Sequence, residues 1–512
     1  MRHCPPRSLL RHSLRAVGIC CLALSQPIWA QSGSGAKLDP GRLLQLAVLQ
    51  NSDLAFSRMQ SRIATEGYLA ETQIYQPALF ANFKRDGRQI QRSVEEQLAA
   101  VLGGITTANE LGRTGEAGAR MRTPTGAELS LSMRVAEKRS NIIASSPTYR
   151  SDTETSGIAT LTIRQPLLRG AGRKVMEVDL RVAEAERDIA AWQYRQQLLR
   201  IGNEALSAYW QLQRAQETQS IRHQALANAR ELKADVLARV SGGRLAPGSE
   251  AEATSMVASR EADLARNAQQ VSEAESRIQV LLDLPPQDRG WPLIGSRLLR
   301  DDAHKLYNEP VVDAALIVWP AYQIALLRKD QAERRLELAD NRKLPALDLQ
   351  LSYANRGLDY GVRDAISSAF STHRPDWGLG VTFDIPLGED VKAKAQHRAQ
   401  RLKVEQSELE LKSVRNALAN ELSSRAQQFN SALLELTGLR IEQASRIELF
   451  EAERLQFQSG IAPLNRLLRR EGDLLESRLR LIDGAMRAEL ALVALRMSDG
   501  TLLSAHEVRI EN

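Results

Sequence analysis

Two long stretches without proline constrain the fold more than any other feature of this sequence. No proline lies between Pro166 and Pro247 or between Pro386 and Pro463, and both stretches are rich in Ala, Leu, Glu, Arg and Gln. Because proline breaks helices and these residues favour them, the pattern predicts two very long helices. The first, over about 174–240, would be about 100 Å long at 1.5 Å per residue. Helices of this length require coiled-coil packing or a helical barrel.

Apolar residues recur at a spacing of seven within these stretches, which supports that expectation. In the first stretch the two series are Leu198, Ala205 and Leu212, and Ile201, Ala208 and Ala215. In the second stretch the matching residues are Leu418, Leu422, Phe429, Leu433 and Leu436. Such series predict a seam along which each helix packs against a neighbour.

Each predicted long helix stops at a turn that contains glycine and proline. The first turn is 241–247 and the second is 459–463, and a further helical pattern follows each, to about residues 284 and 497. Glycine just after one helix and proline at the start of the next are the usual marks of such a junction. The sequence therefore predicts two helical hairpins.

Segments in which apolar and polar residues alternate lie between the helical stretches, and this period of two predicts strands. The five candidates are Leu79 to Lys84, Ala127 to Val135, Gly157 to Arg164, Ala346 to Asn355 and Trp377 to Ile385. Strands of about 10 residues with one apolar face suit a transmembrane barrel. An ordinary half-buried antiparallel sheet is the alternative that the pattern leaves open.

The order of these elements is repeated along the chain, which indicates an internal duplication. Pro77-Ala78-Leu79 matches Pro345-Ala346-Leu347, Gln165-Pro166-Leu167 matches Ile385-Pro386-Leu387, and the two hairpin turns then follow in the same order. We therefore expect one structural repeat over 31–300 and a second over 301–512. Each repeat would contain, in this order, a helix, two strands, a long helix, a turn and a further helix. The first repeat would carry extra residues between its strands.

The N-terminal 30 residues have the pattern of a secretory signal peptide, with four arginines ahead of an apolar stretch. All three cysteines lie within it (Cys4, Cys20 and Cys21), so the exported chain would have no disulfide. The residues before Cys20 match a lipidation site poorly. Without the four arginines, 64 basic residues face 62 acidic ones, which indicates no nucleic-acid partner. Beyond this segment we find no run of about 18 apolar residues that would predict a membrane-spanning helix.

The sequence carries none of the motifs that would indicate an enzyme. It has no H-E-x-x-H, no phosphate-binding glycine loop, no G-x-S-x-G and no C-x-x-C, and its seven histidines are scattered. We therefore expect no catalytic residue, no cofactor and no metal site.

Taken together, the ordered marks from about Pro40 to Leu503 resemble the TolC-type outer-membrane efflux family. They are the duplicated helix–strand order, the Gln165-Pro166-Leu167-Leu168-Arg169-Gly170 segment, the Ile385-Pro386-Leu387 segment, and Gly460 before a helix that ends near Gly500. The resemblance implies an α+β membrane protein of a Gram-negative bacterium, in which three identical subunits share a transmembrane β-barrel and a long α-helical periplasmic barrel. Each subunit of the family supplies four strands to a barrel of 12.

The same resemblance implies the function and the partners. The protein would be the passive exit duct of a tripartite efflux or type I secretion system, for small molecules or a secreted protein. It would meet a periplasmic adaptor protein and an inner-membrane pump. A soluble periplasmic coiled-coil adaptor or scaffold is the alternative from another class of protein.

In the family the hairpin turns form the periplasmic end of the tunnel, so the turn residues are candidate adaptor contacts. They are Gly243, Leu245, Pro247, Gly460, Ile461 and Pro463, although glycine and proline could equally serve only to form the turns. Where the family often has acidic residues after the second turn, this sequence has Arg466 and Arg469. Three copies would form a positive ring that favours anions. Alternatively, these arginines pair with Glu471 or Glu476.

Five strand candidates are one more than the family pattern requires. Our hypothesis is that 119–135 folds as an extra hairpin about Pro124-Thr125-Gly126, outside the set of four strands. Trp377, Tyr353 and Tyr360 could be anchors at a membrane interface or could simply pack on the sheet.

Overall fold

The structure is a computed structural model that describes residues 38–99, 105–144, 151–285, 307, 312–371, 375–386 and 390–506. The predicted signal peptide at 1–30 lies outside the described residues. The chain divides into two compact units. One, the helical unit, comprises Met1–Ala47, Ala205–Ala303 and Leu439–Met486, and the other, the sheet unit, comprises Val48–Glu204, His304–Gly438 and Arg487–Asn512.

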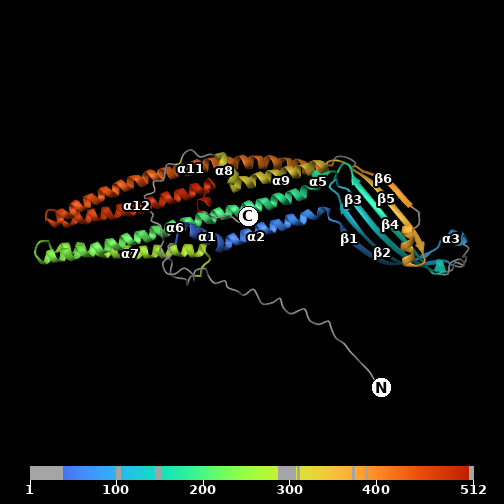
Figure 1. Cartoon of the computed structure of the whole chain (residues 1–512), viewed down its shortest axis with the longest axis horizontal. Coiled ribbons are helices and arrows are strands. Elements are labelled where there is room, and N and C mark those ends of the chain that lie inside the picture. Colours follow the sequence, from blue (N-terminus) through green and yellow to red (C-terminus); the bar gives the residue numbers. More distant parts are fainter. Residues whose placement is uncertain are drawn as a thin grey trace, which may run out of the picture. The chain divides into compact units, whose positions relative to one another are not determined.

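The two long helices are confirmed. α6 (Val178–Ser241) has 64 residues and α11 (Val391–Gln458) has 68. Each is followed by a returning helix, α7 (Gly248–Leu281) after α6 and α12 (Leu464–Ser498) after α11. Figure 1 shows both helical hairpins.

The predicted seams are buried, as coiled-coil packing requires. On α6 the six seam residues are at most 6% exposed. On α11 Leu418, Leu422 and Phe429 are buried in a cluster that also holds Leu316 of α8 (Val312–Val318) and Leu495 of α12. Leu433 and Leu436 are partly buried against the same cluster. Burial of these apolar side chains stabilises the sheet unit through the hydrophobic effect.

The remaining helices are shorter. Within the described residues they are α1 (Pro40–Gln50), α2 (Ser52–Glu71), η2 (Thr72–Tyr75), α3 (Val94–Ala99), α4 (Asn141–Ala144), α5 (Arg173–Met176), α9 (Pro320–Arg342), α10 (Val362–Ser371) and η3 (Ser504–His506). The Asn51 side chain begins α2 by accepting a hydrogen bond from the Leu54 backbone N–H at 3.1 Å. Among the described residues, no helix combines the length and the apolar character that crossing a membrane requires.

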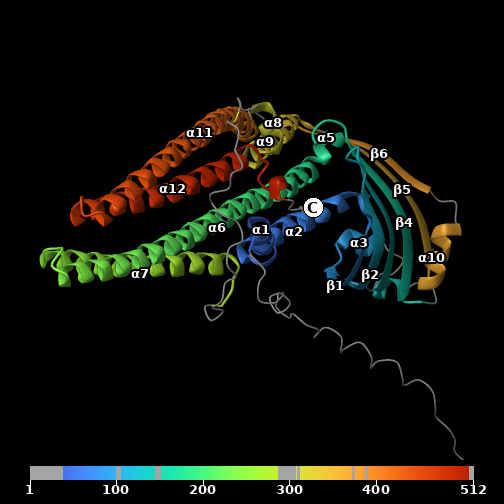
Figure 2. The ribbon, with the colours of Figure 1, turned by 60° about the vertical axis from the view of Figure 1, so that its left-hand side comes forward.

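Six antiparallel strands form one sheet in chain order, each strand paired with its neighbours in the sequence. They are β1 (Ala78–Gln91), β2 (Thr107–Arg122), β3 (Glu128–Ser140), β4 (Thr153–Pro166), β5 (Ala346–Asp359) and β6 (Pro375–Asp384). Figure 2 shows the sheet with β1 and β6 at its two edges. All five strand candidates from the sequence lie in this sheet, and β2 is an addition.

The hypothesis that 119–135 folds outside the sheet is wrong. The predicted turn is present, with the Thr123 N–H donating to the Ala127 carbonyl at 2.8 Å and Gly126 at a φ of 91°. Its two arms are the ends of β2 and β3, and these strands lie between β1 and β4. The reason is that β2 hydrogen-bonds along its length to β1 on one side and to β3 on the other, so the hairpin completes the sheet.

This turn docks against the connection from β4 to α5. The Gly172 N–H donates to the Thr125 carbonyl at 3.0 Å. A Cβ on Gly126 would lie 2.6 Å from the Gly170 carbonyl oxygen, so only glycine fits there. Asn341 of α9 holds the same connection, because its Oδ1 accepts from the Gly170 N–H at 2.7 Å. The Gln165–Gly170 segment thus joins the sheet to the helices.

Candidate functional site

The sheet has two faces of different chemistry. Every register pair joins two odd-numbered residues, as in Leu131 with Leu161, or two even-numbered ones, as in Arg164 with Gln350. All odd-numbered strand residues therefore lie on one face and all even-numbered ones on the other. We call these the odd face and the even face.

The odd face is an exposed apolar band. Between Leu129 and Val135 on β3, and at the matching levels of the other strands, its side chains are apolar or aromatic except that of Asn355. The side chains of Leu79 and Trp377, on the two edge strands, are 87% and 70% exposed. Other large apolar side chains of this band and of its end nearer the long helices, each at least 39% exposed, are Phe83, Met121, Leu131, Leu161, Leu351, Tyr353, Leu379, Val381 and Phe383. Exposed apolar side chains gathered in this way mark a surface that another medium or molecule covers.

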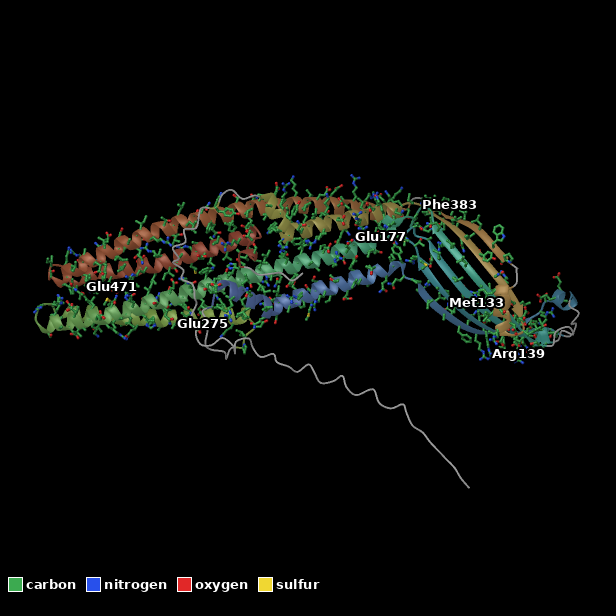
Figure 3. All side chains as sticks on the ribbon, in the orientation of Figure 1. Met133, Arg139, Glu177, Glu275, Phe383 and Glu471 are labelled. Atoms are coloured by element: carbon green, nitrogen blue, oxygen red, sulfur yellow. The ribbon has the colours of Figure 1, made fainter. Side chains whose placement is uncertain are left out.

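Charged residues limit this band on the side away from the long helices. Arg85, Arg113, Glu137 and Asp359 occupy the next level of the odd face. From Leu129 to Val135 the band is about 20 Å long at about 3.3 Å per residue, near the height of the apolar belt of membrane barrels. Figure 3 labels Met133 within the band and Phe383 and Arg139 toward its two ends.

The even face is polar and its charges balance. Its strands carry eight basic residues (Lys84, Arg88, Arg120, Arg122, Arg134, Lys138, Arg164 and Arg356) and eight acidic ones (Asp86, Glu110, Glu116, Glu128, Glu154, Asp348, Asp376 and Asp384). Ion pairs link neighbouring strands, among them Arg164 with Asp348 at 2.6 Å and Arg356 with Asp376 at 2.6 Å. Such a surface is compatible with water and would be costly in lipid.

Helix α10 packs on the odd face, beside β4 and β5 (Figure 2). Two glycines make room for it. A Cβ on Gly157 would lie 2.6 Å from the Ala365 carbonyl oxygen, and one on Gly357 would lie 2.4 Å from the Ala369 backbone nitrogen. Phe370 of the same helix is 70% exposed, so α10 adds to the apolar character of this face.

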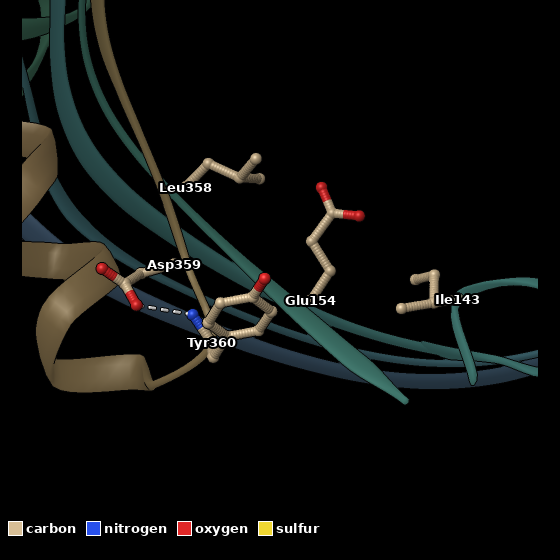
Figure 4. A pocket seen from close by; sticks show the side chains of 5 residues that line it. All are labelled: Ile143, Glu154, Leu358, Asp359 and Tyr360. Atoms are coloured by element: carbon tan, nitrogen blue, oxygen red, sulfur yellow. Dashed lines mark hydrogen bonds between the residues drawn. The ribbon is translucent and has the colours of Figure 1, made fainter. Parts of the chain in front are cut away.

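A small pocket of about 250 Å³ lies at the end of the strands away from the long helices. Its lining, drawn in Figure 4, is Ile143, Glu154, Leu358, Asp359 and Tyr360. The Tyr360 N–H donates to Asp359 Oδ1 at 2.7 Å. Among the described residues no group of three or more His, Cys, Asp or Glu side chains could hold a metal ion.

The two hairpin turns in the helical unit have the same backbone geometry. Gly243 and Gly460 have φ values of 71° and 77°. After each glycine the next N–H, of Arg244 and Ile461, donates to the carbonyl five residues back, at 2.8 and 2.9 Å. This is the glycine-terminated helix end known as the Schellman motif, and it explains why glycine occupies both positions.

The two turns share one apolar cluster in the helical unit. It holds Val236 and Ala253 of the first hairpin and Phe457, Ala462, Leu464 and Leu467 of the second, with Leu245 packed against it. The Arg239 guanidinium lies 4.8 Å from the centre of the Phe457 ring and donates to the Phe457 carbonyl at 3.3 Å. The cluster brings both turns together within this unit.

Most of the predicted adaptor contacts are on the surface of the turns. Gly243, Pro247, Gly460 and Pro463 are exposed, and Ile461 is 75% exposed. Leu245 is half-buried in the shared cluster. Ile461 is thus the large apolar side chain that the turns offer to a partner, and adaptor contact stays a prediction.

The two arginines of the predicted constriction lie close together on α12 but differ in their surroundings. Arg466 pairs with Glu453 of α11 and donates to Gln456 Oε1 at 2.8 Å. Arg469 is exposed and has no ion pair among the described residues. The sequence suggested Glu471 and Glu476 as alternative partners, but Glu471 pairs with Arg260 at 3.4 Å and Glu476 with Arg480 at 3.8 Å.

The pair of Arg260 on α7 and Glu471 on α12 links the two hairpins within the helical unit. Both side chains are largely buried, at 16% and 11% exposed. Burial raises the pKa of Glu471, and Arg260 opposes that rise. Glu471 and Glu275, both labelled in Figure 3, are helical-unit carboxyls whose pKa is raised by burial.

No family model and no curated protein sequence matches this chain. Solved structures do match it over nearly its whole length. VceC, an outer-membrane protein of Vibrio cholerae, is 14% identical, with a TM-score of 0.62, and the match covers 90% of this chain and 96% of VceC. The CmeC outer-membrane channel of Campylobacter jejuni is 11% identical, with a TM-score of 0.62 and coverage of 97% and 94%. The MtrE outer-membrane channel of Neisseria gonorrhoeae is 16% identical, with a TM-score of 0.60 and coverage of 90% and 88%.

This chain has the TolC-type fold. The likeness is one of architecture, because the identities are low while both chains are covered almost completely. The expected helix and strand order of that fold is present, and the six strands exceed the four that the resemblance implied. The two hairpin turns that glycine and proline predicted are present, at Gly243 and Gly460.

Proposed function

We propose that the protein is an outer-membrane channel, the passive exit duct of a tripartite efflux or type I secretion system. It would carry small molecules or a secreted protein across the outer membrane of a Gram-negative bacterium. The observation that carries the proposal is the sheet, whose odd face is apolar and exposed while its even face is polar and balanced in charge. The TolC-type fold, shared with solved outer-membrane channels, supports the same conclusion.

In this proposal the odd face contacts lipid and the even face lines water. A sheet with unpaired edges cannot remain in lipid, because each free N–H or C=O costs several kcal/mol there. Further copies of the chain would therefore close the sheet, and the homotrimer that the family resemblance implies would supply them. The helical hairpins would extend into the periplasm as an α-helical barrel.

The order of elements supports the duplication expected from the sequence. The first half has α2, β1, β4, α6 and α7, and the second has α9, β5, β6, α11 and α12. The β2–β3 hairpin is the extra part of the first half. We propose that the repeats are 31–300 and 301–512, after a signal peptide at 1–30.

At the turns, Ile461 and its neighbours would contact a periplasmic adaptor, which in turn would hold an inner-membrane pump. Exposed Ile461 is the strongest candidate for an apolar anchor in that contact. Ile461→Asp should abolish transport in cells while leaving the purified channel intact. Unchanged transport with this variant would show that the turn is not the docking site.

The proposal as a whole is tested by cell fractionation. We expect the chain in the outer-membrane pellet as a trimer that dissociates on heating, and we expect ion conduction by the purified trimer in planar bilayers. Recovery as a water-soluble protein in the periplasmic extract would instead support a coiled-coil adaptor or scaffold and would refute the channel.

For the arginines on α12 we propose a positive ring at the periplasmic end of the duct. Arg469 is the stronger contributor, because Glu453 compensates the charge of Arg466. The trimer should prefer anions, and the preference should fall in Arg469→Asp and in Arg466→Asp. Single-channel reversal potentials in a salt gradient measure the preference for anions over cations. If neither substitution changes that preference, the proposed positive ring is wrong.

A further inference from the structure

The edges of the sheet carry an inference that rests on the proposed function. We propose that β6 of one copy pairs with β1 of the next, so that three copies form a wall of 18 strands in place of 12. This would give the outer-membrane part of the duct a bore about 1.5 times as wide, since barrel diameter grows roughly in proportion to strand number.

Both edge strands are free for such pairing. Within the described part of the chain, β1 and β6 each have a neighbouring strand on one side only, and nearly every residue of both is exposed. The inner strands, by contrast, are mostly half-buried. A long exposed edge is a ready template for a strand of another molecule.

The faces of the sheet continue to both edges without a break. Leu79 and Phe83 on β1 and Leu379 and Val381 on β6 all lie on the odd face. A neighbour that joins with odd residues opposite odd residues would extend one apolar band around the whole wall. A shift by one residue would place charged side chains in that band, so pairing is confined to like faces.

The charges of the two edge strands complement each other. β1 has three basic residues and one acidic residue (Lys84, Arg85, Arg88 and Asp86), a net charge of +2. β6 has two acidic residues and no basic one (Asp376 and Asp384), a net charge of −2. This favours the contact of β1 with β6 over the contact of either strand with a second copy of itself.

The β2–β3 hairpin is what enlarges the wall. Leu129, Leu131 and Met133 of β3 share the odd face with Ile163 and Leu161 of β4. The hairpin thus presents apolar side chains on the same face as the four other strands. It belongs to the wall, and does not cap or fill the duct.

Cysteine cross-linking tests the edge contact, because the sequence beyond residue 30 has no cysteine. Leu379→Cys on β6 would be combined in turn with a cysteine at each position of β1 and oxidised in outer membranes. Within one chain, five strand spacings of about 4.8 Å put the edges about 24 Å apart along the sheet, too far for a disulfide. We expect covalent dimers and trimers on non-reducing gels from at least one odd-numbered β1 position, and none from even-numbered ones.

Two outcomes overturn the inference alone. If an outer-membrane trimer forms without any such cross-link, or with even-numbered positions linked, the proposed contact is wrong although the channel stands. Recovery in the periplasm would instead refute the proposed function.

A second measurement tests the width without depending on those variants. Removing 105–144 deletes both strands of the hairpin and leaves β1 to lead into β4, with four strands per copy. Polyethylene glycols added only on the sheet side of single channels report the radius of that mouth. The intact protein should admit polymers of about 1.5 times the radius that the deletion variant or CmeC admits. An equal cut-off for the intact protein and CmeC would overturn the wider wall even if the deletion variant does not fold.

Discussion

The helices and the sheet of this protein place their apolar side chains in opposite ways. On α11 Leu422 is 1% exposed within a core cluster, whereas Leu131 on β3 is 58% exposed and Leu79 on β1 is 87% exposed. The sheet is held mainly by its backbone ladders and inter-strand ion pairs, and the helices by packing. The difference teaches that, in the proposed channel, one chain meets two solvents, because side chains that a core would bury are exposed on the face assigned to lipid.

Removing a buried helix side chain should have the largest effect. Leu422→Ala should lower stability by about 2–5 kcal/mol, since it leaves a cavity in the cluster around Leu316 and Leu495. The control is Leu434→Ala on the same helix, where the side chain is 66% exposed. Hydrogen exchange at the amides of α11 measures both. Equal losses would show that the seam does not carry the stability of the helices.

A charge on the odd face should be almost as costly. Leu131→Arg should cost about 2–4 kcal/mol if this face meets the middle of the bilayer. Ser132→Arg places the same side chain on the even face and should cost little. Urea titration of the folded protein in detergent or vesicles compares the two. If Ser132→Arg is the more damaging, the assignment of the faces is reversed.

The long helices could be predicted from the sequence because their signals are local: no proline, good helix formers and apolar residues every seven positions. β2 could not. It carries Gly112, Gly115 and Gly118 and no β-branched or aromatic residue apart from its threonines, so its strand propensity is low. Its place depends on ladders to β1 and β3, which are contacts between segments distant in the chain.

The candidate functional site, like the fold, could be predicted only in part. Glycine and proline identified both turns. The partner of Arg466 could not be predicted from spacing along α12, because Glu453 lies on α11. Glu453 lies seven residues before Gly460 and Arg466 lies six residues after it, so the geometry of a hairpin could have pointed to that pair.

The turns allow a finer comparison between glycines. Gly460→Ala should lower stability by about 1–2 kcal/mol, because its φ of 77° is unfavourable for a residue with a Cβ. Gly472→Ala, in the interior of α12 with nothing within 4 Å of its Cβ position, should instead raise stability by about 0.5–1 kcal/mol. Thermal unfolding of the two variants tests whether their changes in stability have opposite signs. A Gly460→Ala variant more stable than the wild type would refute the Schellman motif at this turn.

The smallest effect should be the pH dependence due to Glu471. Because burial raises the pKa of Glu471, its carboxyl group binds a proton more tightly in the folded chain than in the unfolded chain. The resulting stabilisation is fully present below the ordinary pKa of glutamate and is lost as pH rises through the raised pKa. Relative to Glu471→Gln, the wild-type protein should therefore gain stability as pH falls from about 7 to about 4.5. Parallel unfolding curves at both pH values would contradict this.

The hairpin of β2 and β3 also limits how a wall of this kind can grow. In a sheet whose strands alternate in direction, one added strand would bring the chain out at the wrong end, and β4 could no longer lead into α5 and α6. Two added strands restore the direction, and the docked turn at Gly126 fixes where they reverse. In the proposed channel the circumference would therefore change by an even number of strands per copy, so the width of the duct would change in steps.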